Sequence, residues 1–546
     1  MMRKIALLLN CLISANHFWH VQSSTDRLAH SRRTPEAHGR ISARKALAAL
    51  LLGPTPATAF HASGAGQQVG AKSPHATSRP LRHAPVAAVE ADTAGIEKET
   101  APAVNVDSAA AAVRSAIAAD DITQAPKPGL AEKELFQCDA SCQVWEEFPR
   151  YADTTALGSL QTAAATVAKY MPKPLDRLGG AMRAVEYWAK HAARTSYYAA
   201  NAMAGLAAFQ VRGAEMAESD GVGAGLVSVP QLAAGQILES VMVYEQDWQR
   251  IVEGKYAMPW DMAAGNRQTT LPYALRQSAR FVEEAVGTME RRARGTAEDR
   301  KIWLQSGDIY PEYYKTNYHY QTDGWMSKKS ADVYETSTET LFLGRQDASQ
   351  RASLVPLHGL QGVGGRPLKI LEVACGTGRF GTFLRDNHPT AEVTFVDLSP
   401  FYLEAAREND EYWRTFKSSS SGGRPYARAS FVQAAAENLP FDAGSFDAVV
   451  CVYLFHEMPE GPRAAAAAEM ARVLAPGGTL VLTDSIQRGD RSTLDDLLVG
   501  FENLNEPHYR NYISTNLPDL FTRHGLECGQ KFVACTSKTL SFTKPR

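Results

Sequence analysis

The chain has 546 residues, of which 45% are hydrophobic and 21% charged, as in ordinary globular proteins. The net charge of -2 gives no electrostatic reason to expect nucleic acid or an anionic membrane as a partner. No apolar run reaches the ~18 residues of a membrane-spanning helix, so we expect no transmembrane segment in the mature chain, with peripheral membrane contact left open.

The first 60 residues have the composition of a targeting leader. Two basic residues precede the apolar run Ile5–Ile13, which is the form of a signal peptide. Residues 1–85 hold eleven Arg or Lys but two acids, as in a transit peptide. The order resembles the two-part leader of algae with complex plastids. We predict import into the plastid (chloroplast), with the mitochondrion as an alternative and a disordered terminus without an address as another.

Residues 61–130 are rich in Ala, Pro, Gly, Ser and Thr, and are expected to form a disordered linker because they offer little apolar surface to bury. Directly after them, Cys138 and Cys142 lie in the sequence CDASC. Seven cysteines in the whole chain do not make a disulfide framework, and no second cysteine pair completes a metal site. We therefore predict free thiols, with a redox pair as the alternative, and no metal.

Residues 131–345 are predicted to form a mostly helical region. Apolar residues recur at helical intervals in Leu175–Phe209, Pro230–Val252 and Pro272–Arg294. These stripes predict helices that pack against one another. Within this region, residues 310–334 contain six tyrosines, one histidine and one tryptophan. Such a segment could form a lid or pocket wall, whose aromatic faces attract a cation, or an interdomain packing seam.

From residue 346 to the C-terminus, strand and helix patterns alternate. This order predicts a parallel α/β sheet that ends in an antiparallel pair. The predicted strands are Leu368–Ala374, Ala391–Val396, Ala429–Ala434, Phe446–Val452, Thr479–Thr483, Leu526–Ala534 and Lys538–Thr543. Helices are predicted at Pro400–Asn409 and Arg463–Leu474, with a flexible insertion at Ser418–Gly423.

A ligand of such a sheet binds at the carboxyl ends of the strands. Gly376 and Gly378 follow the first strand in a GxGxxG pattern and allow close approach of the backbone to a ligand. Asp397, at the end of the second strand, could accept both hydroxyls of a ribose. The pattern alone does not separate a nicotinamide cofactor from S-adenosylmethionine (SAM). However, Glu372 would repel a pyrophosphate and could bind the ammonium group of SAM.

Five motifs in order resemble the ubiquinone/menaquinone methyltransferase-like branch of the class I SAM-dependent methyltransferases. They are LEVACGTGR, VDLSP, AENLPF, SFDAVV and RVLAPGGTL, within about 180 residues. The aromatic segment also looks like cyanobacterial and plastid members of unassigned substrate, which extends the resemblance back to about Leu226. The resemblance implies a Rossmann-like class I methyltransferase sheet, SAM as cofactor and methyl transfer to a small molecule.

By this resemblance, Glu372 would bind the methionine ammonium, and Gly376 and Gly378 would pack against the cofactor. Ala374 stands where the family usually has the first glycine of the loop. Cys451, Val452 and Tyr453 would form the floor of the site.

The resemblance also implies that Asp397 holds the ribose and that Leu398 packs against the adenine. Ala436 and Glu437 would lie beside the adenine, mainly through their backbone. Ala435 departs from the family pattern, because an acid that contacts the adenine amine often stands there. Ribose and methionine contacts would then supply most of the affinity.

Methyl transfer from a sulfonium is a direct displacement that requires alignment and a dry site. His456 is the predicted base, since an imidazole titrates near neutrality, and a capping or supporting role is the alternative. His319 and Tyr320 are further candidates. We predict a SAM-dependent methyltransferase for a small-molecule acceptor such as a quinone, lipid or pigment-like plastid metabolite. A SAM-binding protein without catalysis and an NAD-dependent oxidoreductase are the alternatives, and oligomeric state and the methylated atom stay open.

Overall fold

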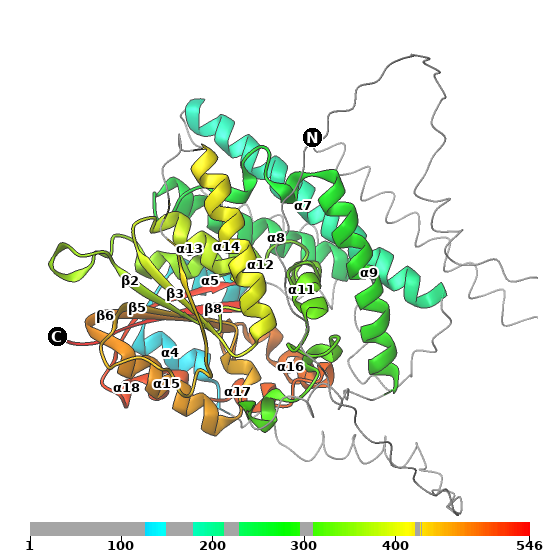
Figure 1. Cartoon of the computed structure of the whole chain (residues 1–546). Helices are drawn as coiled ribbons and strands as arrows, with labels where there is room; N and C mark the ends of the chain where they lie inside the picture. The colour runs from blue at the N-terminus through cyan, green and yellow to red at the C-terminus, as the bar shows by residue number, and fades with distance from the viewer. Residues whose placement is uncertain (1–125, 149–177, 212–228, 295–308, 421–425, 427) are drawn as a thin grey trace, which may run out of the picture. The chain divides into compact units, whose positions relative to one another are not determined.

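The computed structural model describes residues 126–148, 178–211, 229–294, 309–420, 426 and 428–546 (Figure 1). All of them belong to one compact unit that spans Ala112–Arg546. The predicted leader at 1–60 and almost all of the predicted linker at 61–130 lie outside the described residues. The predicted leader and plastid import therefore stay predictions.

A mixed sheet of eight strands forms the centre of the described part of the chain, in the order β1-β7-β8-β6-β5-β2-β3-β4. The strands from β6 to β4 are parallel, whereas β8 runs antiparallel to both β6 and β7. This confirms the predicted Rossmann-like fold with its terminal antiparallel pair. The strands are β1 (Gln137–Cys138), β2 (Lys369–Val373), β3 (Glu392–Asp397), β4 (Ser430–Gln433), β5 (Phe446–Val452), β6 (Leu474–Ser485), β7 (Glu527–Ala534) and β8 (Ser537–Thr543).

The described α-helices fall into an N-terminal pair, a helical region and the helices that connect the strands. They are α4 (Pro128–Leu135), α5 (Ala140–Glu147), α7 (Leu178–Val211), α8 (Val229–Val252), α9 (Leu271–Arg294), α11 (Lys328–Leu341), α12 (Gln346–Gln350), α13 (Arg379–Asn387), α14 (Pro400–Ser420), α15 (Glu460–Val473), α16 (Asp495–Leu498), α17 (Tyr509–Tyr512) and α18 (Leu517–Thr522). None of these described helices has both the length and the hydropathy to cross a membrane.

The two faces of the sheet are both buried, which explains why its central strands read as continuous apolar runs. Along β5, Ala448 and Val450 pack with α13 and α14, whereas Val449 and Cys451 pack with α15 and α18. The period of two in these contacts is the ordinary alternation of a strand. In Figure 1, α13 and α14 cover one face of the sheet and α15 and α18 the other.

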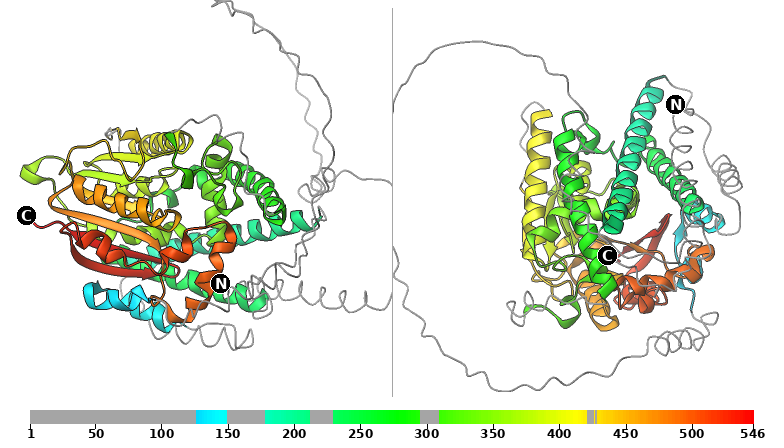
Figure 2. Two further views of the ribbon diagram at one scale, coloured as in Figure 1. Left: turned by 90° about the horizontal axis from the view of Figure 1, so that it is seen from below. Right: turned by 90° about the vertical axis from the view of Figure 1, so that its right-hand side faces the viewer.

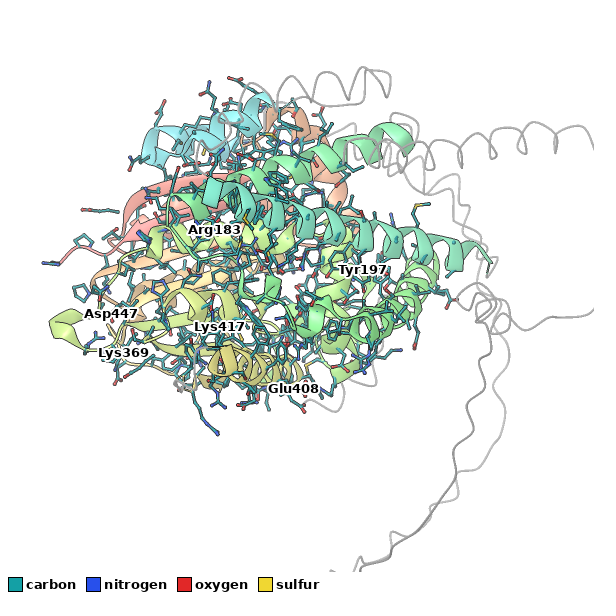
Figure 3. The ribbon with its side chains drawn as sticks, turned by 90° about the horizontal axis from the view of Figure 1, so that it is seen from above. Arg183, Tyr197, Lys369, Glu408, Lys417 and Asp447 are labelled. Carbon is teal, nitrogen blue, oxygen red and sulfur yellow. The ribbon has the colours of Figure 1, made fainter. Side chains whose placement is uncertain are left out.

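Helices α7, α8, α9 and α11 gather at one side of the sheet in Figures 1 and 2, drawn in teal and green. The predicted apolar stripes correspond to α7, α8 and α9. Tyr197 on α7, labelled in Figure 3, donates to the carbonyl of Ala274 on α9 at 3.0 Å. Arg351 donates to both oxygens of Asp247 on α8, at 2.9 and 2.6 Å, and this buried pair joins the helical region to the sheet.

The N-terminal segment differs from the predicted linker and helical region. Helix α4 begins at Pro128, and β1 pairs in parallel with β7 through Gln137 and Gln530. The sheet therefore gains an edge strand from residues more than 200 positions before the predicted start of the domain at 346. A two-residue strand has too little periodicity to be read from sequence.

Four buried charged side chains attach this segment to the sheet. Glu132 on α4 forms an ion pair with Lys531 at 2.8 Å and accepts a hydrogen bond from Lys538 at 2.6 Å. Asp490 pairs with the same two lysines at 2.5 and 3.2 Å. Each side chain is at most 1% exposed, so two positive and two negative charges balance in the interior.

Two element boundaries also differ from the prediction. Helix α14 continues to Ser420, through part of the segment predicted as a flexible insertion. Strand β6 begins at Leu474, five residues before the predicted strand start at Thr479, and it contains the Pro476–Gly478 turn. Its register against β5 shifts between Phe446 and Ala448. The shift accommodates the turn within the strand, as a bulge does.

Candidate active site

The ends of β2 and β3 place two carboxylates at one large cavity. Glu372, one residue before the end of β2, is 2% exposed, and its Oε2 atom has no hydrogen-bond partner among the described residues. Burial, and then the neighbouring Asp397, raise the pKa of Glu372 well above its usual value. An unpaired buried carboxylate is costly on its own and suits a cationic partner. These properties fit the ammonium group of SAM.

Asp397 ends β3 and closes the loop that follows β2. Its carboxylate accepts from the backbone N–H of Gly376 and of Ser399, both at 2.8 Å. Burial raises the pKa of Asp397 to about 6, although these N–H groups act in the opposite direction. The two bonds fix the carboxylate at the strand tip, where a ribose is expected in this class of sheet.

The loop between β2 and α13 is built from residues in the left-handed region. Ala374, Gly376 and Gly378 have φ values of 56°, 55° and 71°. Ala374 and Gly376 line the cavity. Gly378 is not among the described residues that do so. A Cβ there would lie 2.9 Å from Cβ of Ala406 on α14, so the glycine allows close helix packing, and its contact with the cofactor stays a prediction.

Further along the cavity, Leu398, Ala436, Glu437 and Tyr453 contribute to the wall, as their predicted roles require. Cys451 is missing from the described lining because it is fully buried within β5. Strand alternation turns Cys451 into the core while the chain leaves the strand at Tyr453, whose φ is 56°. The predicted floor therefore starts at the end of β5.

The aromatic segment 310–334 both packs and lines the cavity. Tyr313, Tyr314 and Trp325 are among its residues on the cavity wall. The Tyr313 hydroxyl donates to Glu437 at 2.8 Å, and Ser399 Oγ donates to the carbonyl of Trp325 at 2.5 Å. The structure shows both predicted roles, pocket wall and packing seam. Some aromatic residues of the segment line the cavity, and other tyrosines of the segment are buried.

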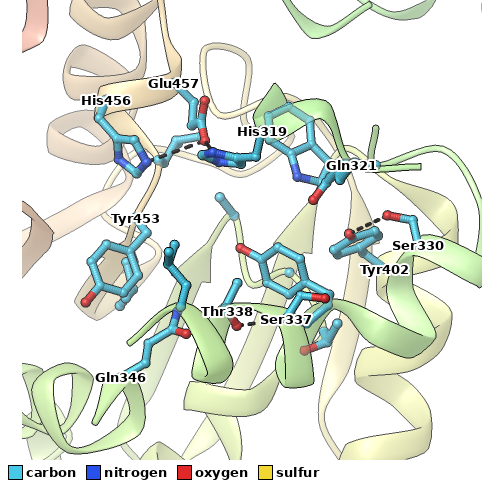
Figure 4. Close-up of a pocket in the computed structure, with 18 of the residues that line it drawn as sticks. His319, Gln321, Ser330, Ser337, Thr338, Gln346, Tyr402, Tyr453, His456 and Glu457 are labelled. Atoms are coloured by element: carbon cyan, nitrogen blue, oxygen red, sulfur yellow. Dashed lines mark hydrogen bonds and ion pairs between the residues drawn. The ribbon is translucent and has the colours of Figure 1, made fainter. Parts of the chain in front are cut away.

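His456 and His319 approach one another across the cavity wall (Figure 4). His456 Nδ1 lies 2.6 Å from Asp484, and His319 Nε2 lies 2.8 Å from Glu457. Burial alone would lower the pKa of His456, but Asp484 and Glu457 raise it well above its usual value. An imidazole that titrates near neutrality was the reason for predicting His456 as the base. The raised pKa differs from that reason, and the identity of the base stays a prediction.

Tyr320 is absent from the described cavity lining. His319 and Tyr320 each have a backbone φ of 56°, so the chain turns sharply at these two residues. The carbonyl of Tyr320 accepts a hydrogen bond from Nε of Arg291, a residue of α9, at 2.6 Å. The structure thus brings His319 and His456 together and separates Tyr320 from them.

The cavity has a volume of about 740 Å³ and joins the strand tips to the helical region. Its apolar wall beyond the strand tips comes from α7, α9, α11 and the segment just before α17. Representative residues are Ala202, Phe281, Ala285, Met289, Val333, Leu341, Phe501 and Leu504. One continuous space therefore contacts both the predicted cofactor residues and a separate apolar surface.

Several residues of the site escaped the sequence reasoning. Glu457 and Glu506 line the cavity and are 6% and 4% exposed. Glu457 follows His456 directly, and its position after the strand was the one available signal. Glu506 lies between short helices without a motif, so the sequence offers no signal for it. Gln346 and Gln350 on α12 also line the cavity, each with a buried oxygen lacking a partner within the described ranges.

Residues 370–478 match a family described as methyltransferase domain. A demethylmenaquinone methyltransferase of Deinococcus radiodurans is 30% identical over 159 residues, which cover 29% of this chain and 58% of that protein. An uncharacterized methyltransferase of Synechocystis is 31% identical over 135 residues, covering 25% of this chain and 54% of that protein. The chain spans about half the length of the curated relatives it matches.

Among solved structures, a TehB-like SAM-dependent methyltransferase from Corynebacterium glutamicum is similar, with a TM-score of 0.27 and 20% identity over 39% of this chain and 97% of that one. A magnesium protoporphyrin IX methyltransferase from Synechocystis with bound SAM has a TM-score of 0.25 and 15% identity, over 37% and 81%. The family match confirms the predicted resemblance to the class I methyltransferases and, with it, SAM as the cofactor.

Proposed function

Since residues 370–478 match a methyltransferase domain family, we propose that the chain transfers a methyl group from SAM to a lipophilic small-molecule acceptor. One observation carries this proposal: a single cavity joins the carboxylates of Glu372 and Asp397 to an apolar chamber. Such a chamber can exclude water from a displacement reaction. A protein that only bound SAM would not need it.

The chain's own residues fit the two ends of SAM. Glu372 would bind the ammonium group, and Asp397 would bind the ribose hydroxyls in place of water. Glu437 would lie beside the adenine with its carboxylate held by Tyr313. When bound, SAM supplies a methyl group on a positively charged sulfur that is activated for displacement. The aromatic wall around Tyr314 and Trp325 favours that positive charge.

The chamber favours an acceptor with a substantial apolar surface. Its wall contains Ala, Val, Leu, Met and Phe side chains from three long helices, and apolar burial is worth about 25 cal/mol per Å². A quinone, a lipid or a pigment-like molecule has such a surface. The relatives include proteins named demethylmenaquinone methyltransferase and phthiotriol/phenolphthiotriol dimycocerosates methyltransferase. Both names describe lipophilic acceptors.

Two measurements test the proposal. Calorimetry with SAM, S-adenosylhomocysteine and NAD(H) should show binding of the first two and none of the third. Incubation of the chain with SAM and a plastid lipid or pigment extract should then give a product heavier by one CH₂ group, detected by mass spectrometry. Binding of NAD(H) in place of SAM would refute the assignment. SAM binding without any methylated product would leave a non-catalytic SAM-binding protein.

We further propose the plastid as the site of action, on the composition of residues 1–85. Expression of the whole chain in an alga with a complex plastid, followed by sequencing of the mature N-terminus, tests this. Cleavage within the first 60 residues is the expected result, and an intact Met1 would contradict it.

A further inference from the structure

Two glutamine side chains of α12, Gln346 and Gln350, line the cavity, and their amide groups have no hydrogen-bond partner within the described part of the chain. They are 7% and 9% exposed, and both belong to the cavity wall. The Oε1 atom of each is buried without a partner, and neither amide nitrogen bonds to a described residue. Since a buried polar group in a protein normally has a partner, two such amides on one wall indicate a ligand that supplies it. We call these two residues the glutamine pair.

The glutamine pair faces one side of α12, and the charged side chain between them faces another. Residues four positions apart lie on the same face of an α-helix. Asp347, the residue after Gln346, points in another direction and forms ion pairs with Arg194 and Arg379 at 2.7 and 2.6 Å. The face of α12 that carries the glutamine pair therefore adds no charge of its own to the cavity.

The start of α12 lies near the turn between β7 and β8. Arg345 precedes Gln346 and pairs with Glu239 at 3.3 Å, and Glu239 pairs with Arg491 at 3.0 Å. Arg491 donates to the carbonyl of Cys535, between β7 and β8, at 3.5 Å. In the sheet order, β8 lies on the opposite side of β5 from β2 and β3, whose ends carry the cofactor carboxylates. The glutamine pair thus lies toward the other end of the cavity, which we call the acceptor end.

The positively charged side chains of the described cavity lining are already paired. Arg379 is the one Arg or Lys of that lining, which contains six Asp or Glu residues. Figure 4 shows His319, Glu457 and His456 across the cavity from Gln346. The pairs are Arg379–Asp347 at 2.6 Å, His319–Glu457 at 2.8 Å and His456–Asp484 at 2.6 Å. A carboxylate or phosphate on the acceptor would therefore be buried beside acids without a cation of its own, which is unfavourable.

A glutamine amide suits an uncharged partner. It has a carbonyl that accepts hydrogen bonds and an NH₂ group that donates them. Because no bond to a described residue holds either amide of the glutamine pair, a half-turn about the last side-chain bond can bring either end toward the cavity. A hydroxyl donates and accepts, and a carbonyl accepts, so both groups can satisfy these amides. A site for an anion would instead be expected to hold an arginine or a lysine.

We propose that Gln346 and Gln350 determine which acceptors bind, by hydrogen bonding to an uncharged hydroxyl or carbonyl group of a molecule whose apolar body fills the chamber. This inference rests on the proposed methyltransferase function. The glutamine pair orients the acceptor and takes no part in the displacement itself. Acceptors with a carboxylate or phosphate at this position are rejected, since the described lining offers them acids and no unpaired cation.

Ligand binding tests the inference with two probes that share one ring system. Naphthol is uncharged near neutral pH, and naphthoate carries a negative charge. Each is titrated into the full chain by calorimetry, with and without S-adenosylhomocysteine. We expect naphthol to bind at least about tenfold more tightly, because a buried carboxylate without a cation is unfavourable. Equal affinities, tighter binding of naphthoate, or no binding of naphthol would each overturn the inference.

Two variants test the role of the glutamine pair directly. Gln346→Met and Gln350→Met each remove one amide at a similar side-chain length. Each should weaken naphthol binding by about threefold to tenfold, the effect of one neutral hydrogen bond, whereas the affinity for naphthalene, which has no hydroxyl, should stay the same. Gln143→Met, at an exposed position of α5, is the matched control and should change neither affinity. Unchanged naphthol affinity in both glutamine variants would show that the inference is wrong.

Unfolding in urea separates a binding role of the glutamine pair from a structural one. An amide without a partner adds no hydrogen bond to the ligand-free fold, so both variants should unfold at the same urea concentration as the wild type or at a higher one. A lower midpoint with unchanged naphthol affinity would assign the glutamines to packing and overturn the inference. If one variant does not fold, the other variant and the comparison of naphthol with naphthoate still decide.

SAM affinity distinguishes a failure of this inference from a failure of the proposed function. Neither variant should change the affinity for SAM, because the glutamine pair lies away from the cofactor carboxylates. A loss of SAM affinity in Gln346→Met would place this residue in the cofactor site and overturn the inference. With the acceptor found in the extract, both variants should raise KM for that acceptor more than they lower kcat. If the wild type binds naphthol through the glutamine pair but binds no SAM, the proposed function fails and the polar subsite stands.

Discussion

The cofactor end and the acceptor end of the cavity are assembled in different ways. Glu372, Gly376 and Asp397 lie within 26 residues of one another, on two adjacent strands and the loop between them. At the acceptor end, His319 contacts Glu457 and Glu506, and His456 contacts Asp484, so side chains up to 187 positions apart meet there. The cofactor end is local in sequence, and the acceptor end depends on the tertiary structure.

This difference has a consequence for electrostatics. At the cofactor end, Glu372 has an oxygen without a hydrogen-bond partner within the described structure, and its pKa is raised. A bound cation would stabilise the ionised form of this carboxyl group. At the acceptor end, charges of both signs already pair with one another. Substitutions at the first end should therefore change ligand affinity more than stability, and substitutions at the second end should change proton affinity.

The largest effect that we expect at the cofactor end is from Glu372→Gln. It should weaken SAM binding by about 2–3 kcal/mol, since a charge-assisted hydrogen bond is lost. The stability of the SAM-free protein should stay equal or rise, because an unpaired buried charge is removed. Calorimetry and urea unfolding measure the two quantities. Glu392→Gln, at the exposed start of β3, is the control. If Glu372→Gln lowers the stability of the protein and leaves its SAM affinity unchanged, the contrast between the two ends of the cavity is wrong.

Asp397→Ala should weaken SAM binding by about 1–3 kcal/mol through the loss of bonds to the ribose. The backbone N–H groups of Gly376 and Ser399 also lose their acceptor, so some loss of stability should accompany it. Asp442→Ala, at an exposed turn, controls for the change of charge. Unchanged calorimetric affinity would exclude Asp397 from the ribose site.

A smaller effect should follow from pH alone. Because burial raises the pKa of Asp397 to about 6, its carboxylate takes up a proton in the SAM-free protein as the pH falls through that value. SAM affinity should then drop by roughly tenfold between about pH 7 and about pH 5 from this group alone. The stability of the SAM-free protein should change in the opposite direction through Asp397, since the folded state binds this proton more tightly than the unfolded state. Affinity that is constant over this interval would contradict the raised pKa.

The smallest effect should come from Tyr320→Phe. Its side chain is not part of the described cavity lining, so turnover should stay within about twofold of the wild type, as for substitutions outside a site. His319→Gln, one residue earlier, should reduce turnover because it removes the ion pairs with Glu457 and Glu506 at the cavity wall. Equal losses in the two variants would mean that the segment acts through its packing and not through His319.

The contrast between local and long-range contacts also explains how much of the fold and of the site could be predicted from the sequence. The strand pattern and the GxGxxG loop led to the fold, to Glu372 and to Asp397, because each depends on neighbours in the sequence. The close approach of Gly378 to Ala406 on another helix was not predicted, because the two residues are distant in the sequence. The raised pKa of His456 was not expected, because Asp484 meets this ring only through long-range folding. Glu506 could not be found, as no periodicity marks it.

The buried group of Glu132, Asp490, Lys531 and Lys538 limits how this protein can be shortened. A fragment that began at residue 346, where the motifs suggest a domain boundary, would lack Glu132 and leave two interior lysines with one carboxylate. It would also expose the outer edge of β7, which β1 covers, and open edges promote aggregation. Recombinant work on the catalytic part should therefore retain the polypeptide from about Pro128 onward.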